Sequence, residues 1–445
     1  MGEVVNISLG STSNLFDTFF YQHFKSLNEP DISLNRFFSN NNLTKPRCVH
    51  VDHSSASGPL SLVGATKIDI PVDHDAEISQ IQTPIDSSEA EIQTWLSFHS
   101  TTPSFITYPG WNHRGVFDRF TYGIAACEED SLHFTISEQV RKQTELCDAP
   151  SSFFITCDNS GWTGVAASLI PILQDDFNIS LTCSLFDSSL ELVGTKDSHY
   201  NHLSRSLLLS ECSQAGYFIP LSFEFNHPAS NIDGNNSLEI NNSLLFSNFY
   251  FNLFKPLLLN EKLTVSHFLE PLCTQSRRSV FGGSVIFPSK FSNNQEDFIS
   301  QFKSPISSSH EFYNLSYPIK FDCSPIEDGA LFVAGGVESS MKTYQYFKSI
   351  FPSNYSRVYL SSLGNNSLEN SELKFPSLFI NQPSCFPISS LLSSSSLISP
   401  YIDLVSKSLG KVKKSLFVGD DYCPNLSDFE SIKEHIASLN DLYLE

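Results

Sequence analysis

The segment with the clearest capacity for chemistry is a short run of small residues after an apolar stretch. The run is Ser160-Gly161-Trp162-Thr163-Gly164, and it follows residues 153–157, which have the composition of a strand buried on both faces. Small residues let backbone N–H groups approach a phosphate, and a helix expected over about residues 165–173 would add its positive N-terminus. The pattern indicates an anion site, although tight turns also use glycine for purely conformational reasons.

Three further turns follow predicted strands and could contribute to the same site. The strands are expected at residues 3–9, 47–51 and 104–108, and they lead into Gly10, Asp52 and Gly110. Helical patterns, such as the one over residues 132–146, alternate with the strands, which favours an α/β fold with a doubly wound, mostly parallel sheet. Such folds bind ligands where the strands end, so we expect Gly10, Asp52, Gly110 and Ser160 along one edge.

Other patterns that could support catalysis are less specific. Gly335-Gly336 before Lys342-Thr343 resembles a phosphate-binding Walker loop, but Met341 stands where that loop requires glycine. The sequence has no GxSxG elbow, and none of its ten separated cysteines stands out as a nucleophile. We therefore expect no catalytic residue.

Histidine and aspartate lie close together at residues 50–53 and 73–75, and His199 and His202 lie on one predicted helical turn; each group could supply metal ligands. On a strand, however, His50 and Asp52 share one face while His53 points to the other, and the sequence signals no fourth ligand. Surface or capping roles are favoured, and we expect no metal site.

The overall charge excludes some classes of partner. The 445 residues include 27 Lys and Arg against 48 Asp and Glu, for a net charge of −21. Direct binding to nucleic acid or to an anionic membrane surface is disfavoured, because both require clustered cations.

The cysteines and the absence of targeting patterns bear on location. No CxxC pair is present, which is typical of thiols in a reducing compartment. The sequence shows neither a leader pattern nor a long apolar run, so we expect a cytosolic protein without a transmembrane segment.

Composition shifts divide the chain into predicted units. Residues 1–225 form the first α/β domain, and the polar segment 226–243 is expected to be a loop. The apolar stretch 244–260 is expected to be a core helix at least as far as Lys255, because Pro256 follows. Residues 261–388 form a second α/β sheet domain, with strands at 281–287 and 330–334 and a helix at 339–350. Residues 389–445 contain a Ser-rich loop, at 389–399, and C-terminal helices, the last at 426–444.

Taken together, these motifs resemble the tubulin superfamily in order and spacing. Residues 3–14 are similar to the tubulin opening E-I-V-H-I-Q-A-G-Q-C-G-N, and residues 46–52 to P-R-A-I-L-V-D. Residues 147–164 run without a gap along the tubulin segment from its C-D pair to its G-G-G-T-G signature. Tyr200-Asn201 and the final helix continue the resemblance, which thus covers nearly the whole chain and implies a tubulin-like fold.

Within that superfamily the sequence resembles the Misato family of tubulin-like proteins, because Cys157-Asp158 precedes a Gly161-Trp162-Thr163-Gly164 version of the phosphate loop. The resemblance implies a role in the distribution and inheritance of mitochondria and of mitochondrial DNA. It also implies cytosolic chaperonin, tubulin or other cytoskeletal proteins as partners. Localisation would be cytoplasmic, in peripheral association with mitochondria.

The departures from tubulin bear on nucleotide binding. Ser160 and Trp162 replace two of the three signature glycines, and the bulk of Trp162 would take space that a phosphate needs. Leu221 stands where the resemblance places a guanine-reading asparagine, and Ser54 stands where tubulin has an acid. No residue near Glu270 reproduces the acidic motif that completes the neighbour's active site in tubulin.

Two functions remain as expectations. The favoured one is a non-enzymatic, tubulin-like factor with a degenerate nucleotide site. The alternative is a self-assembling, GTP-binding GTPase of the cytoskeleton that holds GTP through Gly10, Ser11, Asp52, Ser160, Gly161, Thr163 and Gly164.

Overall fold

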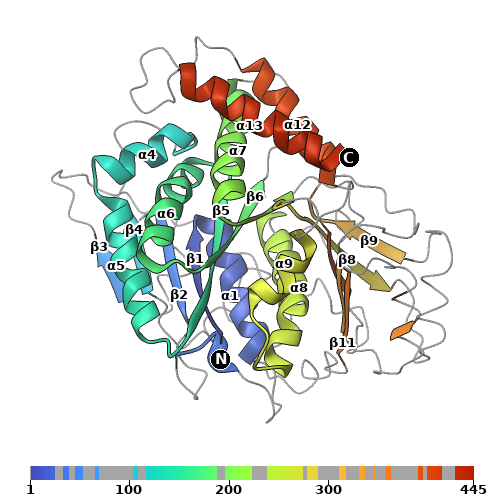
Figure 1. The fold of residues 1–445 in the computed structure, drawn as a ribbon. Helices are drawn as coiled ribbons and strands as arrows, with labels where there is room; N and C mark the ends of the chain where they lie inside the picture. Colours follow the sequence, from blue (N-terminus) through green and yellow to red (C-terminus); the bar gives the residue numbers. More distant parts are fainter. Residues whose placement is uncertain are drawn as a thin grey trace.

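A parallel sheet of seven strands forms the centre of the first half of the chain (Figure 1). Its order is β3-β4-β2-β1-β5-β6-β7, and every neighbouring pair is parallel. The strands are β1 (Glu3–Leu9), β2 (Cys48–His53), β3 (Thr66–Asp69), β4 (Ser104–Tyr108), β5 (Pro150–Asp158), β6 (Ser180–Asp187) and β7 (Tyr217–Ser222). The protein is therefore an α/β protein with a parallel sheet, as the sequence predicts.

The structure is a computed structural model of the 445-residue chain. It describes residues 2–25, 34–39, 46–53, 66–69, 104–108, 117–187, 196–222, 238–273, 278–288, 310–316, 330–335, 344–345, 348, 356–361, 389–393, 398–412 and 426–444. The predicted turn at Gly110 and the histidine at position 74 lie outside these residues, as do Ser54 and most of the helix expected at 339–350.

Helices cover both faces of the first sheet. One face carries α4 (Phe120–Glu128), α5 (Leu132–Glu145), α6 (Gly161–Phe177) and α7 (Lys196–Ala215). The other carries α1 (Ser11–Lys25), η1 (Leu34–Arg36), α8 (Leu238–Leu259) and α9 (Val265–Cys273). Alternate residues of β5 serve the two cores: Phe153 and Ile155 pack on the first face and Phe154 on the second. This explains why the strand is apolar throughout.

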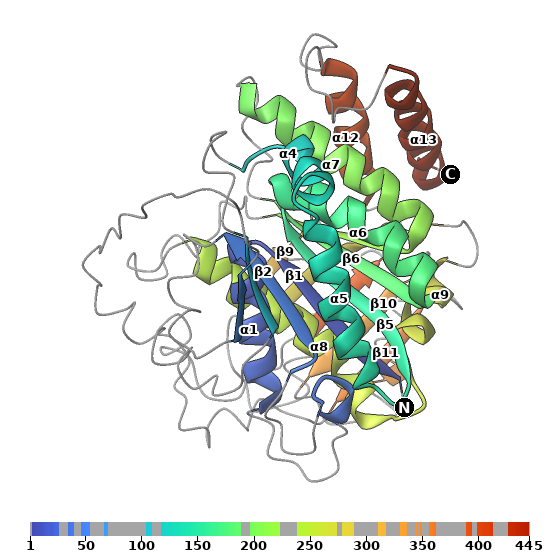
Figure 2. The same ribbon diagram turned by 90° about the vertical axis from the view of Figure 1, so that its left-hand side faces the viewer.

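Helix α8 lies between this sheet and a second, five-stranded one (Figure 1). Figures 1 and 2 also show α1 beside α8, where Phe16 and Tyr250 meet with ring centroids 5.5 Å apart. The second sheet has the order β11-β10-β12-β8-β9, with β10 and β11 parallel and the other pairs antiparallel. Its strands are β8 (Gly282–Pro288), β9 (His310–Asn314), β10 (Ala330–Gly335), β11 (Arg357–Ser361) and β12 (Ser389–Ser393).

Two helices close the chain against α7, namely α12 (Ser399–Lys411) and α13 (Leu426–Leu444) (Figure 2). The Tyr443 hydroxyl joins the last turn of α13 to Val280, because it donates to the Val280 carbonyl at 2.7 Å and accepts from the Val280 N–H at 2.8 Å.

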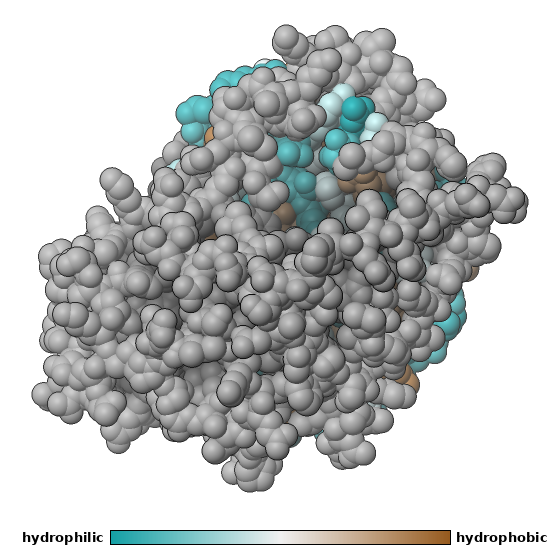
Figure 3. All heavy atoms as spheres, turned by 180° about the vertical axis from the view of Figure 1, so that it is seen from behind, coloured by the Kyte–Doolittle hydropathy of each residue, from teal (hydrophilic) through white to brown (hydrophobic). Residues whose placement is uncertain are grey.

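On the face seen in Figure 3, the described residues that reach the surface are mainly hydrophilic. No helix in the described ranges combines the length and apolar character needed to cross a bilayer.

The Ser-rich tract is not wholly the loop that its composition predicts. Residues Ser389–Ser393 form β12, which pairs with β10 on one side and β8 on the other, and Ser399 opens α12. The Ser-rich composition wrongly indicates a loop. A central strand is stabilised by backbone hydrogen bonds to both neighbours, and a Ser-Ser-Leu-Leu-Ser segment forms these bonds as well as an apolar segment does.

Helix α8 also departs from its expected limits. It begins at Leu238, inside the segment predicted to be a polar loop, and continues through Pro256 to Leu259. The proline is tolerated because the turn after it still closes, with the Asn260 N–H bonded to the Pro256 carbonyl at 3.2 Å, and because Leu257 and Leu258 are buried. Helix α6 likewise starts earlier than expected, at Gly161, so the signature residues form its first turn rather than a loop.

Candidate functional site

The carboxyl edge of the first sheet brings together β1, β2 and β5 with the N-termini of α1 and α6. Gly10 directly follows β1 and has φ +104°, a conformation that favours glycine. A Cβ at this position would lie 2.4 Å from Asp158 Oδ2 and 2.8 Å from Trp162 Cδ1. The turn is therefore packed directly against the residues at the end of β5 and the start of α6.

The N-terminus of α1 is occupied by a carboxylate from the protein itself. Asp158 Oδ2 accepts the Thr12 N–H at 3.0 Å, and Oδ1 accepts the Ser13 N–H at 3.0 Å and the Ser13 hydroxyl at 2.7 Å. An anion at a helix N-terminus is stabilised by unpaired N–H groups and by the helix dipole. Asp158 thus takes the place that a phosphate oxygen would need at this helix.

The N–H groups at the start of α6 also donate within the protein. The Gly161 N–H bonds the Phe117 carbonyl at 3.1 Å, the Trp162 N–H reaches the Ser160 hydroxyl at 3.4 Å, and the Thr163 N–H bonds the Ser160 carbonyl at 3.1 Å. The Thr163 hydroxyl donates to the same carbonyl at 2.6 Å. This first turn is capped by its own residues, with Ser160 as N-cap.

The signature glycines have a packing role that their spacing alone does not reveal. A Cβ on Gly164 would lie 2.0 Å from the Phe120 carbonyl oxygen, and one on Gly123 would lie 1.9 Å from the Gly161 carbonyl oxygen. A Cβ on Gly161 would meet the Phe117 ring at 2.5 Å. Close contact of α6 with α4, and with Phe117 just before α4, therefore accounts for these glycines without a ligand.

Trp162 is 4% exposed and belongs to an aromatic group that covers the edge. Its ring centroid lies 5.0 Å from His53 and 5.0 Å from Phe117, and Tyr108 lies 5.9 Å from Phe117. Burial lowers the pKa of His53 to about 4, so the imidazole is neutral at physiological pH. The edge is thus covered by neutral aromatic side chains.

Asp52 is buried near the end of β2, where it faces α1. Its Oδ1 accepts the His53 N–H at 2.8 Å, and the Asn14 amide lies 3.4 Å from Oδ2 and donates to the Val51 carbonyl at 3.1 Å. Asp52 therefore helps to join β2 to the first turn of α1.

The structure brings most of the predicted residues to one edge. Gly10 and Asp52 end or nearly end their strands, half-buried Ser11 opens α1, and the remaining four lie at the start of α6: Ser160, Gly161, Thr163 and Gly164. The prediction that these residues hold GTP remains a prediction. Leu221 is fully buried in the core beside α8, so its side chain takes part in packing.

Asp158 is the residue at this edge whose role the sequence did not reveal. An aspartate at the end of a buried strand and just before a helix is a recognisable signal for N-terminal capping. The helix it caps, however, is α1, whose Thr12 and Ser13 lie 146 and 145 residues earlier in the chain. Only the pairing of β1 with β5 places the two together.

Arg119 also lies beside the site, in front of α4. Its guanidinium carbon lies 4.1 Å from the centre of the Tyr200 ring on α7 and 5.1 Å from that of Tyr122. A second polar contact lies deeper, where the Asn159 amide donates to Asp187 Oδ1 at 2.8 Å and buried Arg205 pairs with Asp187. These contacts join α7 to the ends of β5 and β6.

No protein-family model matches this chain, and a search of curated proteins finds none with significant similarity.

Proposed function

We propose that this chain is a tubulin-like protein of the Misato type that acts without nucleotide turnover, as a factor in the distribution and inheritance of mitochondria and mitochondrial DNA. The observation that supports the non-enzymatic part is the carboxylate of Asp158 on the N-terminus of α1. The mitochondrial part rests on the sequence resemblance alone.

The Asp158 carboxylate would repel a phosphate bound beside it. A phosphate oxygen bound near the N-terminus of α1 would approach Asp158, which holds the Thr12 and Ser13 N–H groups. Two like charges about 4 Å apart repel by about 4 kcal/mol at an effective dielectric constant near 20. That energy corresponds to about a thousandfold loss of affinity. A nucleotide would also have to displace the buried Trp162.

The charge of the protein bears on its partners. With a net charge of −21, direct contact with mitochondrial DNA is unfavourable, so an effect on its inheritance would pass through other proteins. Cytosolic chaperonin, tubulin and other cytoskeletal proteins are the partners that the resemblance suggests, and peripheral association with mitochondria from the cytoplasm is the corresponding location.

Nucleotide binding is the first test. The purified full-length chain is denatured to release any bound nucleotide, and native protein is titrated with a fluorescent GTP analogue and magnesium. We expect neither co-purified GTP nor micromolar binding. The control is the double variant Asp158→Gly with Trp162→Gly, which removes the competing charge and the bulk. Stoichiometric GTP in the wild-type protein would instead support the GTPase alternative.

The cellular role needs a separate test. Depletion of the protein should disturb mitochondrial distribution and lower mitochondrial DNA content, as measured by imaging and quantitative PCR. Re-expression of a Thr163→Ala variant should restore both, because the Thr163 hydroxyl bonds the Ser160 carbonyl in the first turn of α6 and so has a capping role. Normal mitochondria after complete depletion would refute the mitochondrial assignment, whatever the nucleotide result.

A further inference from the structure

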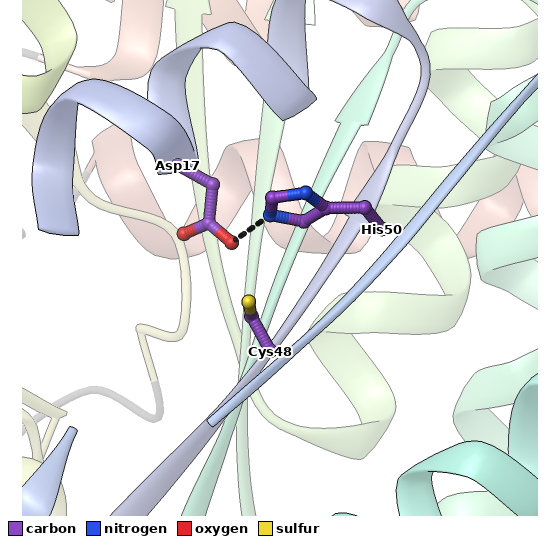
Figure 4. Close-up of side chains that lie close together, drawn as sticks. All are labelled: Asp17, Cys48 and His50. Carbon is purple, nitrogen blue, oxygen red and sulfur yellow. Dashed lines mark hydrogen bonds and ion pairs between the residues drawn. The ribbon is translucent and has the colours of Figure 1, made fainter. Parts of the chain in front are cut away.

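Three side chains with metal-binding atoms meet in the core between α1 and β2 (Figure 4). Asp17 comes from α1, and Cys48 and His50 come from β2. Their ligand atoms all lie within 4.8 Å of one another, and Asp17 Oδ2 is 2.9 Å from His50 Nε2. Figure 4 shows the Cys48 sulfur pointing toward the same space as the carboxylate and the ring.

The backbone explains why these residues meet. Cys48 and His50 are two residues apart on one strand, so their side chains share a face, and α1 packs on that face. The three side chains are between 0% and 1% exposed. The sequence pattern grouped His50 with Asp52 and His53 instead, because an aspartate on a distant helix could not be assigned to the cluster from spacing.

A fourth polar side chain contacts the cluster. Asn6 on β1 is the register partner of Cys48, and its amide nitrogen donates to Asp17 Oδ1 at 2.8 Å. Its own Oδ1 is buried and has no hydrogen-bond partner among the described residues. A buried polar atom left unpaired costs about 1–3 kcal/mol. Asn6 thus offers an unused oxygen on a side chain that contacts the cluster through Asp17.

A nucleophilic role for Cys48 does not fit the site. A Cys-His-Asp set can serve covalent catalysis when the thiol is accessible and its pKa is low. Here Cys48 is 0% exposed. Burial and the nearby Asp17 carboxylate raise the pKa of the Cys48 thiol well above its ordinary value. A substrate could not reach the sulfur, and the sulfur would not be a thiolate in the absence of a cation.

We propose that Asp17, Cys48 and His50, completed by the side-chain oxygen of Asn6, bind one zinc ion that joins α1 to β1 and β2. The single sulfur favours Zn²⁺ over Mg²⁺ or Ca²⁺. The charges of Zn²⁺, the Asp17 carboxylate and a Cys48 thiolate cancel, with His50 neutral, so a buried site carries no net charge.

Zinc binding would move the ligand atoms, which lie up to 4.8 Å apart. Tetrahedral zinc with bonds of about 2.0 Å places oxygen and nitrogen ligands about 3.3 Å apart. Asp17 Oδ2 and His50 Nε2 lie 2.9 Å apart, so they would separate by about 0.4 Å. Binding releases the thiol proton of Cys48. The proton that His50 Nε2 donates to Asp17 must also leave that nitrogen, so the neutral ring then carries its proton on Nδ1. Nδ1 is buried and has no hydrogen-bond partner in the described part of the chain, so zinc on Nε2 would leave an N–H unpaired there.

The test measures metal in the full-length protein expressed with added zinc. We expect about one zinc per chain by mass spectrometry. Cys48→Ser and Asp17→Asn should reduce this content at least tenfold. The matched control is Cys127→Ser, because Cys127 on α4 is equally buried but lies in the other core. Zinc-free wild-type protein, or zinc retained in Cys48→Ser, would overturn the proposal.

X-ray absorption spectroscopy of the wild-type protein keeps the test decisive if the variants fail to fold. The expected zinc shell contains one sulfur and three nitrogen or oxygen atoms, whereas a shell with no sulfur or with several would refute this site. Expression with cobalt should give a thiolate-to-metal absorption band that is lost in Cys48→Ser and kept in Cys127→Ser. This inference does not depend on the proposed function, and neither result bears on nucleotide binding.

Discussion

Replacement of Asp158 by alanine should destabilise the protein and create an anion site. The Asp158 carboxylate accepts hydrogen bonds from the Thr12 N–H, the Ser13 N–H and the Ser13 hydroxyl. Loss of a capping side chain costs about 1 kcal/mol, and each donor left unsatisfied in a part-buried site costs about 1–3 kcal/mol. Since water can reach part of the site, we expect a total loss of about 2–4 kcal/mol.

Urea denaturation measures this loss, with Asp148→Ala as the matched control. Asp148 is exposed just before β5, so its replacement should change the free energy of unfolding by less than about 0.5 kcal/mol. Adding phosphate should then show whether the lost stability comes from the empty N-terminus of α1. At about ten times its dissociation constant, phosphate should restore about 1.4 kcal/mol to Asp158→Ala. It should do little for the wild-type protein at matched ionic strength.

Two outcomes would refute this reasoning. If Asp158→Ala unfolds at the same urea concentration as Asp148→Ala, the carboxylate does not hold α1. If phosphate stabilises the wild-type protein and Asp158→Ala equally, the N-terminus of α1 accepts anions despite Asp158, and the main support for a nucleotide-free site is lost.

Two further predictions concern packing and pH. Gly164→Ala should cost more than about 2 kcal/mol in urea denaturation, because its Cβ would lie 2.0 Å from the Phe120 carbonyl oxygen. Gly410→Ala, a helical site with nothing within 4 Å of the added carbon, should instead stabilise by up to about 1 kcal/mol, and equal effects of the two would contradict the packing role. Burial lowers the pKa of His23 from 6.5 to about 3 and that of His53 to about 4. Only the unfolded chain therefore binds these protons below pH 6.5. Stability should fall by up to about 1.4 kcal/mol per pH unit for each histidine as pH drops toward those values. His53→Phe should flatten the profile of unfolding free energy between pH 6.5 and 4, and an unchanged slope would contradict the assignment.

Elements with a strong local pattern were predictable from the sequence. The apolar run in β5 and the helical periodicity of α5 gave the right element types and nearly the right ends, because both follow from the side-chain period of a single segment. The final helix was predicted at 426–444, which is where α13 lies. Failures occurred where distant partners decide the structure. Residues Ser389–Ser393 became a strand only because β8 and β10 flank them.

The candidate site shows the same division. Residue types and their order along the chain determined that Gly10, Asp52 and Ser160 would follow strands and meet at one edge, since parallel strands end together. The tertiary structure decided which side chains lie at that edge. Asp158 reaches the N-terminus of α1 only because β1 pairs with β5, and Trp162 covers the turn only because Gly10 leaves room for it.

The sequence by itself determined the α/β class, the parallel sheet and the excess of negative charge, because these depend on local periodicity and on composition. The tertiary structure decided which polar groups meet. The Asp158 cap and the cluster of Asp17, Cys48 and His50 each join segments that are 31 or more residues apart. Such contacts depend on strand register and helix placement, which no local pattern encodes.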